Sequence, residues 1–425
     1  MSKDWDPIIR VIGLPQHNCE ELIREFAEEC DGQLLILGAP RVLSELPQEF
    51  YDDPQIFITA AYGEYPSPAE LIDDWNQGTH IIVMASGNPL FFGVGSRLIE
   101  RYENVECFPG LSCLEMASAK MGLPSNSVIP LSILVEDPNI IKLYAELERP
   151  LAILLKNGEQ LATACAMLPA NWRVHLFHAL GMEEEQWLIF PADNPPEIES
   201  SLVMMVAMPE ASSTRLPMMG LPDDLFLASG PMTKHNARAM VVSLSAQCQA
   251  QNPVIFDLGA GSGSVGLEIA RFFALQNAGR AVRSGDMYGT RLVAIEKNAT
   301  RAKEIEVNAE ARGLKGAVTV VNKELSLDSF SDALVIGDGK ADIIYYGGGL
   351  SKDFLLTSMH FLSPGGILIV PAVTVESQTL LMDYINDEDW DFQAVSFSNL
   401  KEIGSFHAFQ PALPLVYGIY RKPLE

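Results

Sequence analysis

The chain has 425 residues, 48% of them hydrophobic and 20% charged, which is ordinary for a folded protein but long for one hydrophobic core, so we expect two domains. Its net charge of −26 argues against wholesale binding to nucleic acid or to an anionic membrane, because phosphate-rich surfaces are bound by clustered Lys and Arg. The sequence has neither an apolar run of about 18 residues nor a signal peptide, so neither membrane insertion nor export is expected.

The first half of the chain alternates short apolar runs with amphipathic stretches. We expect strands at 8–14, 33–38, 80–85 and 105–108 and helices at 19–29, 67–76, 95–102 and 113–121. This alternation indicates an α/β domain with a mostly parallel sheet. From about Leu151 the pattern changes to more evenly spaced strands, at 152–155, 173–177, 187–190 and 202–207. We interpret these later strands as a second lobe of the same domain.

A stretch rich in proline, glycine and small polar residues, 209–222, has the composition of a linker. It divides the chain into domains at 1–208 and 223–425. Beyond it we expect a helix at 232–244 and strands at 254–258, 291–296, 318–321, 341–346, 366–371, 392–397 and 415–420. The last two strands are predicted to form an antiparallel edge. The long polar connection at 276–290 is interpreted as a surface insertion.

The cysteines and histidines give no indication of disulfides or of a metal site. The six cysteines contain no Cys-x-x-Cys pair, which is typical of a reduced, cytoplasmic protein. His175 and His178 are three residues apart in a predicted strand, so their side chains point to opposite faces and no metal site is expected.

The most informative segment reads Val-Ile-Phe-Asp-Leu-Gly-Ala-Gly-Ser-Gly, where an apolar strand ends in Asp257 and leads into Gly259, Gly261 and Gly263. Side chains there would keep the backbone away from a ligand, and the helix that follows offers free N–H groups to ligand oxygens. The next predicted strand ends in Glu296, a carboxylate suited to accept the hydroxyl protons of a ribose. The spacing Asp-x-Gly-x-Gly-x-Gly resembles motif I of Rossmann-like methyltransferases that use S-adenosylmethionine (SAM). The alternative is a tight strand–helix connection without a ligand.

Two segments of the first half resemble the central motifs of the tetrapyrrole methylases. They read Ala-Ser-Gly-Asn-Pro-Leu-Phe-Phe-Gly-Val-Gly at 85–95 and Phe-Pro-Gly-Leu-Ser-Cys-Leu-Glu-Met-Ala-Ser-Ala-Lys-Met-Gly-Leu-Pro at 108–124. Members of that family have two α/β lobes and hold SAM in the cleft between them. The residues implied to bind the cofactor are Gly87, Asn88, Pro89 and Ser112.

The second half resembles the decarboxylating half of the fused precorrin methyltransferases of the cobalamin pathway. The resemblance is carried by Gly-Leu-Pro-Asp-Asp-Leu-Phe at 220–226, Met-Thr-Lys at 232–234 and Ala-Val-Thr-Val-Glu at 372–376, with the glycine motif between them. Together, the resemblances of the first and the second half cover nearly the whole chain. The implied fold is a two-lobed tetrapyrrole methylase followed by a Rossmann-like class I SAM methyltransferase domain.

The implied reaction starts from an anionic tetrapyrrole, precorrin-6B. The first half methylates C5, and the second half methylates C15 and removes the carboxyl group of the C12 acetate, giving precorrin-8X. Methyl transfer to an electron-rich carbon needs orientation and a dry cleft, so no catalytic triad is assigned. Residues expected to meet the substrate are Thr233, Lys234, Arg238, Gly347 and Gly348. The resemblance also implies a homo-oligomer formed through the second half.

The first half departs from the tetrapyrrole methylase pattern in three places. No glycine-rich loop follows the first strand, Asn88 replaces the usual Asp, and the usual His-Gly-Arg is absent after Pro130. Asn88 removes a negative charge near the sulfonium, and Pro15 lacks a backbone donor, so we expect weak SAM binding and slow or missing C5 methylation. Two alternatives stay open. One is methylation of another anionic tetrapyrrole or small molecule, and the other is a first half that serves as a non-catalytic tetrapyrrole- or SAM-binding scaffold.

Overall fold

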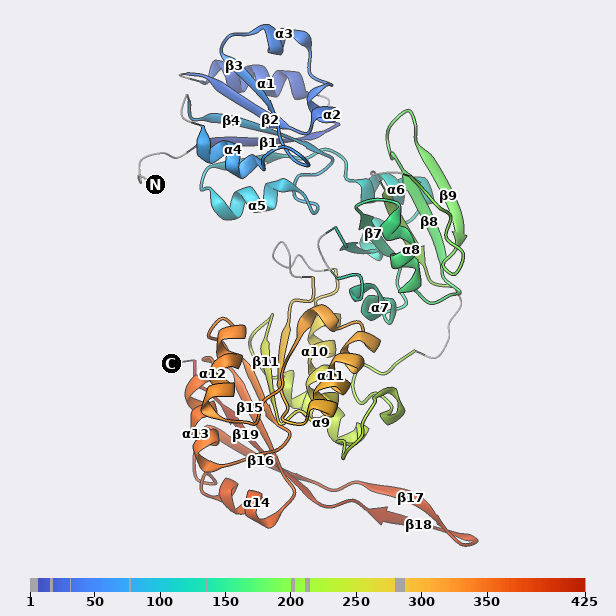
Figure 1. Ribbon diagram of the computed structural model, residues 1–425, viewed down its shortest axis with the longest axis vertical. Coiled ribbons are helices and arrows are strands. Elements are labelled where there is room, and N and C mark those ends of the chain that lie inside the picture. Colours follow the sequence, from blue (N-terminus) through green and yellow to red (C-terminus); the bar gives the residue numbers. More distant parts are fainter. Residues whose placement is uncertain are drawn as a thin grey trace.

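The structure is a computed structural model that describes residues 7–15, 18–30, 32–75, 78–134, 137–199, 203–210, 215–279 and 287–424. Within these ranges the strands form two five-stranded sheets, a seven-stranded sheet and a separate two-stranded ribbon (Figure 1). The two five-stranded sheets belong to the first half of the chain, and the seven-stranded sheet and the ribbon belong to the second half. No helix in the described ranges is both long enough and apolar enough to cross a membrane.

Lobe 1 is built on a parallel sheet with strand order β3-β2-β4-β1-β5. Its strands are β1 (Ile8–Leu14), β2 (Leu34–Gly38), β3 (Ile56–Ala60), β4 (His80–Ser86) and β5 (Val105–Phe108). Helices α1 (Cys19–Glu28), α2 (Pro40–Leu43) and α3 (Gln48–Asp52) pack on one face, while α4 (Pro68–Asp74) and α5 (Val94–Arg101) pack on the other. The central strands are continuously apolar because both faces of the sheet are covered.

Lobe 2 contains a mixed sheet with strand order β6-β7-β10-β8-β9. Its strands are β6 (Ile129–Ser132), β7 (Leu151–Leu155), β8 (Arg173–His178), β9 (Gln186–Pro191) and β10 (Val203–Met208). Strand β6 runs parallel to β7 and the other pairs are antiparallel. The helices of this lobe are α6 (Cys113–Met121), α7 (Ile140–Ala145) and α8 (Glu159–Ala166). The predicted second lobe is therefore confirmed, with β6 as an edge strand that the sequence pattern did not indicate.

The second half forms a sheet with order β13-β12-β11-β14-β15-β19-β16. Its strands are β11 (Val254–Leu258), β12 (Arg291–Ile295), β13 (Val318–Val321), β14 (Ile343–Tyr346), β15 (Ile367–Ala372), β16 (Trp390–Val395) and β19 (Leu415–Arg421). The first five are parallel, and β19 is antiparallel to both β15 and β16, as predicted for the edge.

Six helices cover the two faces of this seven-stranded sheet. Those on one face are α9 (His235–Ser245), α10 (Ser264–Gln276) and α11 (Ala299–Ala311). Those on the other face are α12 (Leu327–Ile336), α13 (Lys352–Phe361) and α14 (Val375–Met382). The described part of the second half therefore has the three-layer Rossmann-like architecture that the sequence predicts.

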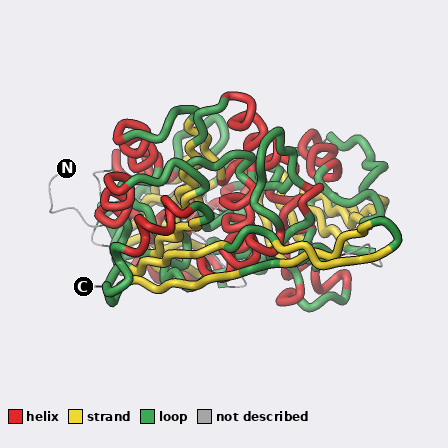
Figure 2. Tube along the Cα trace, turned by 90° about the horizontal axis from the view of Figure 1, so that it is seen from below, coloured by secondary structure: helices red, strands yellow, loops and turns green. Residues whose placement is uncertain are grey.

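An exposed ribbon extends from the edge of the large sheet. Strands β17 (Ser398–Ile403) and β18 (Phe406–Pro411) pair with each other, and every residue in them is exposed. Figures 1 and 2 show the ribbon running on from the end of the sheet where β16 and β19 lie. This ribbon is not predictable from the sequence pattern, because its residues face no core that would impose a regular apolar pattern.

Lobe 2 and the second half share one continuous hydrophobic cluster, in which α7 packs against α10. At this interface the Tyr144 hydroxyl donates to the carbonyl oxygen of Met287 at 2.6 Å, and Arg271 Nη2 lies 2.6 Å from Glu146 Oε2. The prediction of a surface insertion at 276–290 is wrong for its described ends, because Asn277 and Tyr288 are buried. Residues 280–286 of that segment lie outside the described ranges.

Candidate functional site

Two glycine-containing loops meet at the carboxyl end of the large sheet. One follows β11 and the other follows β14, the neighbouring strands at which the strand order reverses direction. A Cβ on Gly259 would lie 2.8 Å from the Gly348 carbonyl oxygen, and a Cβ on Gly347 would lie 2.5 Å from the Gly259 carbonyl oxygen. Open α/β sheets bind ligands at such a switch point. The predicted cofactor loop and the predicted substrate loop are therefore adjacent in the structure.

The three motif glycines all have left-handed backbone conformations, with φ of 72° at Gly259, 59° at Gly261 and 75° at Gly263. A Cβ on Gly263 would lie 2.9 Å from a methyl carbon of Ile305, so this glycine is required by packing. A Cβ on Gly261 would have no heavy atom within 4 Å. The outer surface of the loop at Gly261 is thus open to a ligand.

Glu296 follows β12 and is almost completely buried, with 5% of its surface exposed. Its Oε2 accepts a hydrogen bond from the Gly261 N–H at 2.8 Å, and its Oε1 accepts one from the Asn298 N–H at 2.9 Å. The carboxylate therefore fixes the shape of the glycine loop. Each oxygen keeps a second lone pair, so the predicted contact with a ribose stays a prediction.

Asp257 lies at the end of β11 and is fully buried. Its Oδ2 accepts a hydrogen bond from the Gly266 N–H at 3.0 Å, whereas its Oδ1 has no partner among the described residues. Burial raises the pKa of this carboxyl to about 7, and the negative charge of Glu296 adds to the rise. This oxygen is an unsatisfied polar group beneath the glycine loop, out of reach of solvent.

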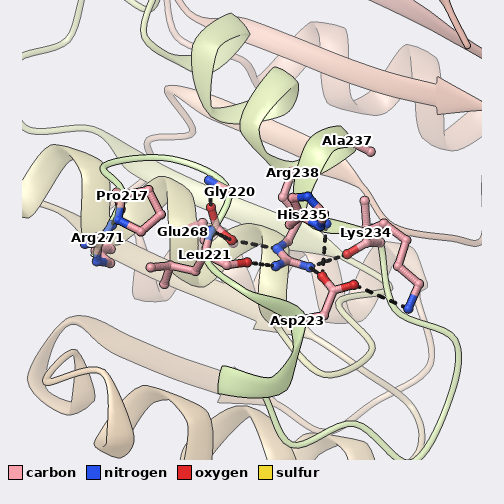
Figure 3. A network of polar contacts seen from close by, with 12 residues as sticks. Pro217, Gly220, Leu221, Asp223, Lys234, His235, Ala237, Arg238, Glu268 and Arg271 are labelled. Carbon is pink, nitrogen blue, oxygen red and sulfur yellow. Dashed lines mark hydrogen bonds and ion pairs between the residues drawn. The ribbon is translucent and has the colours of Figure 1, made fainter. Parts of the chain in front are cut away.

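Arg238 is completely buried in a polar network (Figure 3). Its Nε lies 2.6 Å from Glu268 Oε1, and its Nη1 lies 2.8 Å from Asp223 Oδ1. The guanidinium also donates to the carbonyl oxygens of Leu221 and Thr233. The prediction that Arg238 meets a substrate carboxylate is therefore wrong, because protein groups occupy the guanidinium and solvent does not reach it.

Thr233 and Lys234 lie where the chain enters α9. Lys234 is exposed, with its Nζ 3.4 Å from Asp223 Oδ2, and it lines a cavity of about 520 Å³. The Thr233 side chain hydrogen-bonds to the buried hydroxyl of Tyr345. Gly348 is exposed, with no heavy atom within 4 Å of a Cβ built on it. Their contacts with substrate stay predictions, as does that of Gly347.

A second cavity, of about 460 Å³, lies between the two lobes of the first half. Of the four residues expected to bind a cofactor there, Gly87, Asn88 and Ser112 line it. The Asn88 side chain accepts a hydrogen bond from the Leu90 N–H at 2.9 Å, and Ser112 caps the N-terminus of α6. Pro89 does not line the cavity. Its carbonyl oxygen accepts a hydrogen bond from the Gly95 N–H at 2.9 Å, which shapes the loop behind the cavity.

Known protein families match both halves of the chain. The family described as "Tetrapyrrole (Corrin/Porphyrin) Methylases" matches residues 21–195, and the family described as "Precorrin methyltransferase domain" matches residues 224–422. The chain is a tetrapyrrole methylase domain fused to a precorrin methyltransferase domain. The predicted fold class is confirmed by these matches together with the sheet topology.

Relatives match either the whole fusion or one domain of it. Precorrin-6Y C(5,15)-methyltransferase (decarboxylating) of Mycobacterium tuberculosis (strain CDC 1551 / Oshkosh) is 27% identical over 422 residues, 95% of each chain. Cobalt-precorrin-6B C(15)-methyltransferase (decarboxylating) of Salmonella typhimurium is 28% identical over 203 residues, which is 46% of this chain and 92% of that protein. The crystal structure of the C-terminal domain of precorrin-6Y C5,15-methyltransferase from Rhodobacter capsulatus is 22% identical in sequence, with a TM-score of 0.41. The match covers 49% of this chain and 100% of that chain.

The precorrin methyltransferase domain contains buried polar residues that the sequence analysis missed. Glu268 accepts hydrogen bonds from the Gly220 and Leu221 N–H groups, and so holds the end of the predicted linker against α10. The Asn308 side chain donates to the carbonyl oxygens of Ser262 and Leu227, joining the glycine loop to the segment before α9. A signal for Glu268 was present, because a charged residue within an otherwise apolar helix requires a buried partner.

The raised pKa of Asp257 predicts a pH dependence of stability. The folded state holds a proton that the unfolded state loses near pH 4, so folding is favoured at low pH and stability falls as pH rises toward 7. Between pH 5 and 8 this site should remove about 2–3 kcal/mol from the free energy of unfolding. Asp257→Asn should abolish that part of the slope, measured by urea denaturation across the pH range. The exposed Asp338→Asn is the control, and an equal slope in wild type and Asp257→Asn would contradict the assignment.

Proposed function

We propose that this chain is a SAM-dependent enzyme that methylates C5 and C15 of precorrin-6B and removes the carboxyl group of the C12 acetate. The product would be precorrin-8X, an intermediate in cobalamin biosynthesis. The observation that carries the proposal is the order of the two domains, which is matched over 95% of this chain by a relative whose name states the C(5,15) and decarboxylating activities. The six unpaired cysteines are in keeping with the predicted cytoplasmic location.

The glycine loop of the precorrin methyltransferase domain is the proposed main SAM site. The backbone at Gly261 leaves open space, and the Glu296 carboxylate next to it would accept the hydroxyl protons of the ribose. The unpartnered Asp257 oxygen lies beneath the loop. A cationic cofactor near Asp257 would favour the ionised carboxylate and so lower its raised pKa. When bound, SAM supplies an electrophilic methyl group. The protein orients the substrate carbon and excludes water at the meeting point of the two loops.

The proposed substrate side of this domain is the exposed Gly347–Gly348 turn together with Thr233 and Lys234. Lys234 lines the cavity of about 520 Å³ together with Asp223 and Asp224, and its ammonium group, 3.4 Å from Asp223 Oδ2, would bind a substrate carboxylate there. Because the whole chain has a net charge of −26, attraction of a polyanionic tetrapyrrole depends on such local cations. Arg238 takes no part in this contact and instead holds the segment that carries Thr233.

The cleft of the tetrapyrrole methylase domain is the proposed C5 methylation site. Gly87, Asn88 and Ser112 line its cavity, in keeping with a second SAM site. Asn88 provides the loop hydrogen bond to Leu90 but no negative charge. The departures in the sequence predict SAM binding weaker than at the C-terminal loop and slow or missing C5 methylation, and of these two outcomes we propose slow C5 methylation.

Purified protein incubated with precorrin-6B and SAM should give a product that has gained two methyl groups and lost one carbon dioxide, as measured by mass spectrometry.

Gly261→Ala should raise the KM for SAM in C15 methylation by about 10- to 100-fold, because the new methyl group occupies ligand space. The control is Gly339→Ala. Gly339 has a similar φ of 74°, and a Cβ built on it likewise has no heavy atom within 4 Å. It lies before β14, at the opposite end of the strands from Gly261.

Two outcomes of this experiment would count against the proposal. Unchanged precorrin-6B after incubation with stable wild-type protein would reject the reaction itself. Equal KM values for SAM in Gly261→Ala and Gly339→Ala would reject the glycine loop as the cofactor site, even if the reaction were observed.

We also propose that the chain forms a homo-oligomer through the β17–β18 ribbon. Phe406 and Phe409 are 76% and 72% exposed, and Leu413 is 76% exposed, which is an unusual concentration of large apolar side chains in water. Sedimentation equilibrium should find a dimer or larger species that Phe406→Ser with Phe409→Ser converts to a monomer. Val335→Ser, at an exposed apolar position on α12, is the control. A monomeric wild type would contradict the proposal.

A further inference from the structure

Arg41, on α2, lies in the cavity between the lobes of the tetrapyrrole methylase domain. Its Nη1 is 3.6 Å from the Met182 sulfur and its Nη2 is 3.4 Å from the Ser86 hydroxyl oxygen. Both contacts are at the long limit of hydrogen bonding and neither is to an anion. Among the described residues that line this cavity, Arg41 is the one cation, and no ion pair joins it to Glu45, the carboxylate on the same wall.

Three other arginines of lobe 1 have carboxylate partners. Arg10 pairs with Glu29, Arg24 pairs with Glu49, and Arg101 pairs with Asp73. The half-buried Arg41 has two weak neutral contacts in place of such a partner. Because a guanidinium has five donors arranged to match a carboxylate, its position in this cavity without an ion pair to Glu45 is typical of a site for an anionic ligand.

The rest of the cavity wall is mainly apolar. Phe91, Phe92, Met116 and Phe177 contribute large apolar surfaces to it. Phe92 has a φ of 50°, a left-handed conformation that is rare for a bulky residue and is found preferentially at functional sites. An apolar wall with one guanidinium matches a flat macrocycle that carries carboxylates on its edge.

We propose that Arg41 binds a peripheral carboxylate of the tetrapyrrole and thereby orients the macrocycle for methylation in the N-terminal cleft. This inference rests on the proposed function. Arg41 contacts Ser86, which directly precedes the predicted cofactor residues Gly87 and Asn88, so a substrate held there would lie next to the proposed cofactor site. The carboxylate of SAM itself has the same chemistry, and the experiment separates the two sources.

The test uses full-length Arg41→Gln and Arg41→Lys with precorrin-6B and SAM carrying a ¹³C-labelled methyl group. Methyl groups at C5 and C15 then give separate NMR signals. Arg41→Gln should raise the KM for precorrin-6B in C5 methylation by about 10- to 100-fold, the loss expected when a charged hydrogen-bond donor is removed. C15 methylation and the affinity for SAM, measured by calorimetry, should not change. Arg41→Lys should restore part of the loss, and Arg24→Gln, outside the cavity, should behave as wild type.

Each other result has a distinct meaning. An unchanged KM for precorrin-6B in Arg41→Gln overturns the proposal. A weakened SAM affinity with an unchanged KM for precorrin-6B also overturns it, because the bound carboxylate is then that of the cofactor. A wild type that gives the C15 signal without a C5 signal overturns the role of Arg41 and leaves the second domain's activity intact. A wild type that gives neither signal contradicts the proposed function as a whole.

Discussion

Helix α10 joins the glycine loop to the domain interface through two buried charges. Its N-terminus begins at the left-handed Gly263, one turn later Glu268 binds Arg238 and the end of the linker, and Arg271 reaches Glu146 of lobe 2. Buried charges are costly without partners, so these contacts fix which segments lie against the helix. The position of the glycine loop, of the segment that carries Thr233, and of the neighbouring domain all depend on this one helix.

The two candidate sites use different means of leaving room for a ligand. In the precorrin methyltransferase domain, glycine loops after β11 and β14 touch each other at Gly259 and Gly347 and leave Gly261 open. In the tetrapyrrole methylase domain, the room lies between two lobes, with Gly87 and Arg41 on one side and Met182 on the other. The first arrangement depends on backbone geometry and the second on the packing of two sheets, as expected for two unrelated folds in one chain.

The sequence predicted those features that have a local cause. Apolar runs and their spacing predicted the parallel strands and the antiparallel edge. The glycines at 259, 261 and 263 predicted a tight loop after the strand, and in the structure all three have positive φ angles. It did not predict partners distant along the chain. Arg238 follows a family motif and was interpreted as a substrate contact, but its partner Glu268 is 30 residues away and the pairing is visible only once α9 packs on α10. The cavity position of Arg41 was missed for the same reason. The β17–β18 ribbon was missed because its exposed residues face no core that would impose an apolar pattern.

We propose that one chain contains two separate SAM sites, one in each domain. Equilibrium dialysis of full-length protein with labelled SAM measures this directly, since it counts the ligand bound per chain. Two sites of unequal affinity are expected, of which Gly261→Ala weakens the tighter one. A single site per chain, or two sites that Gly261→Ala leaves unaffected, would contradict this proposal.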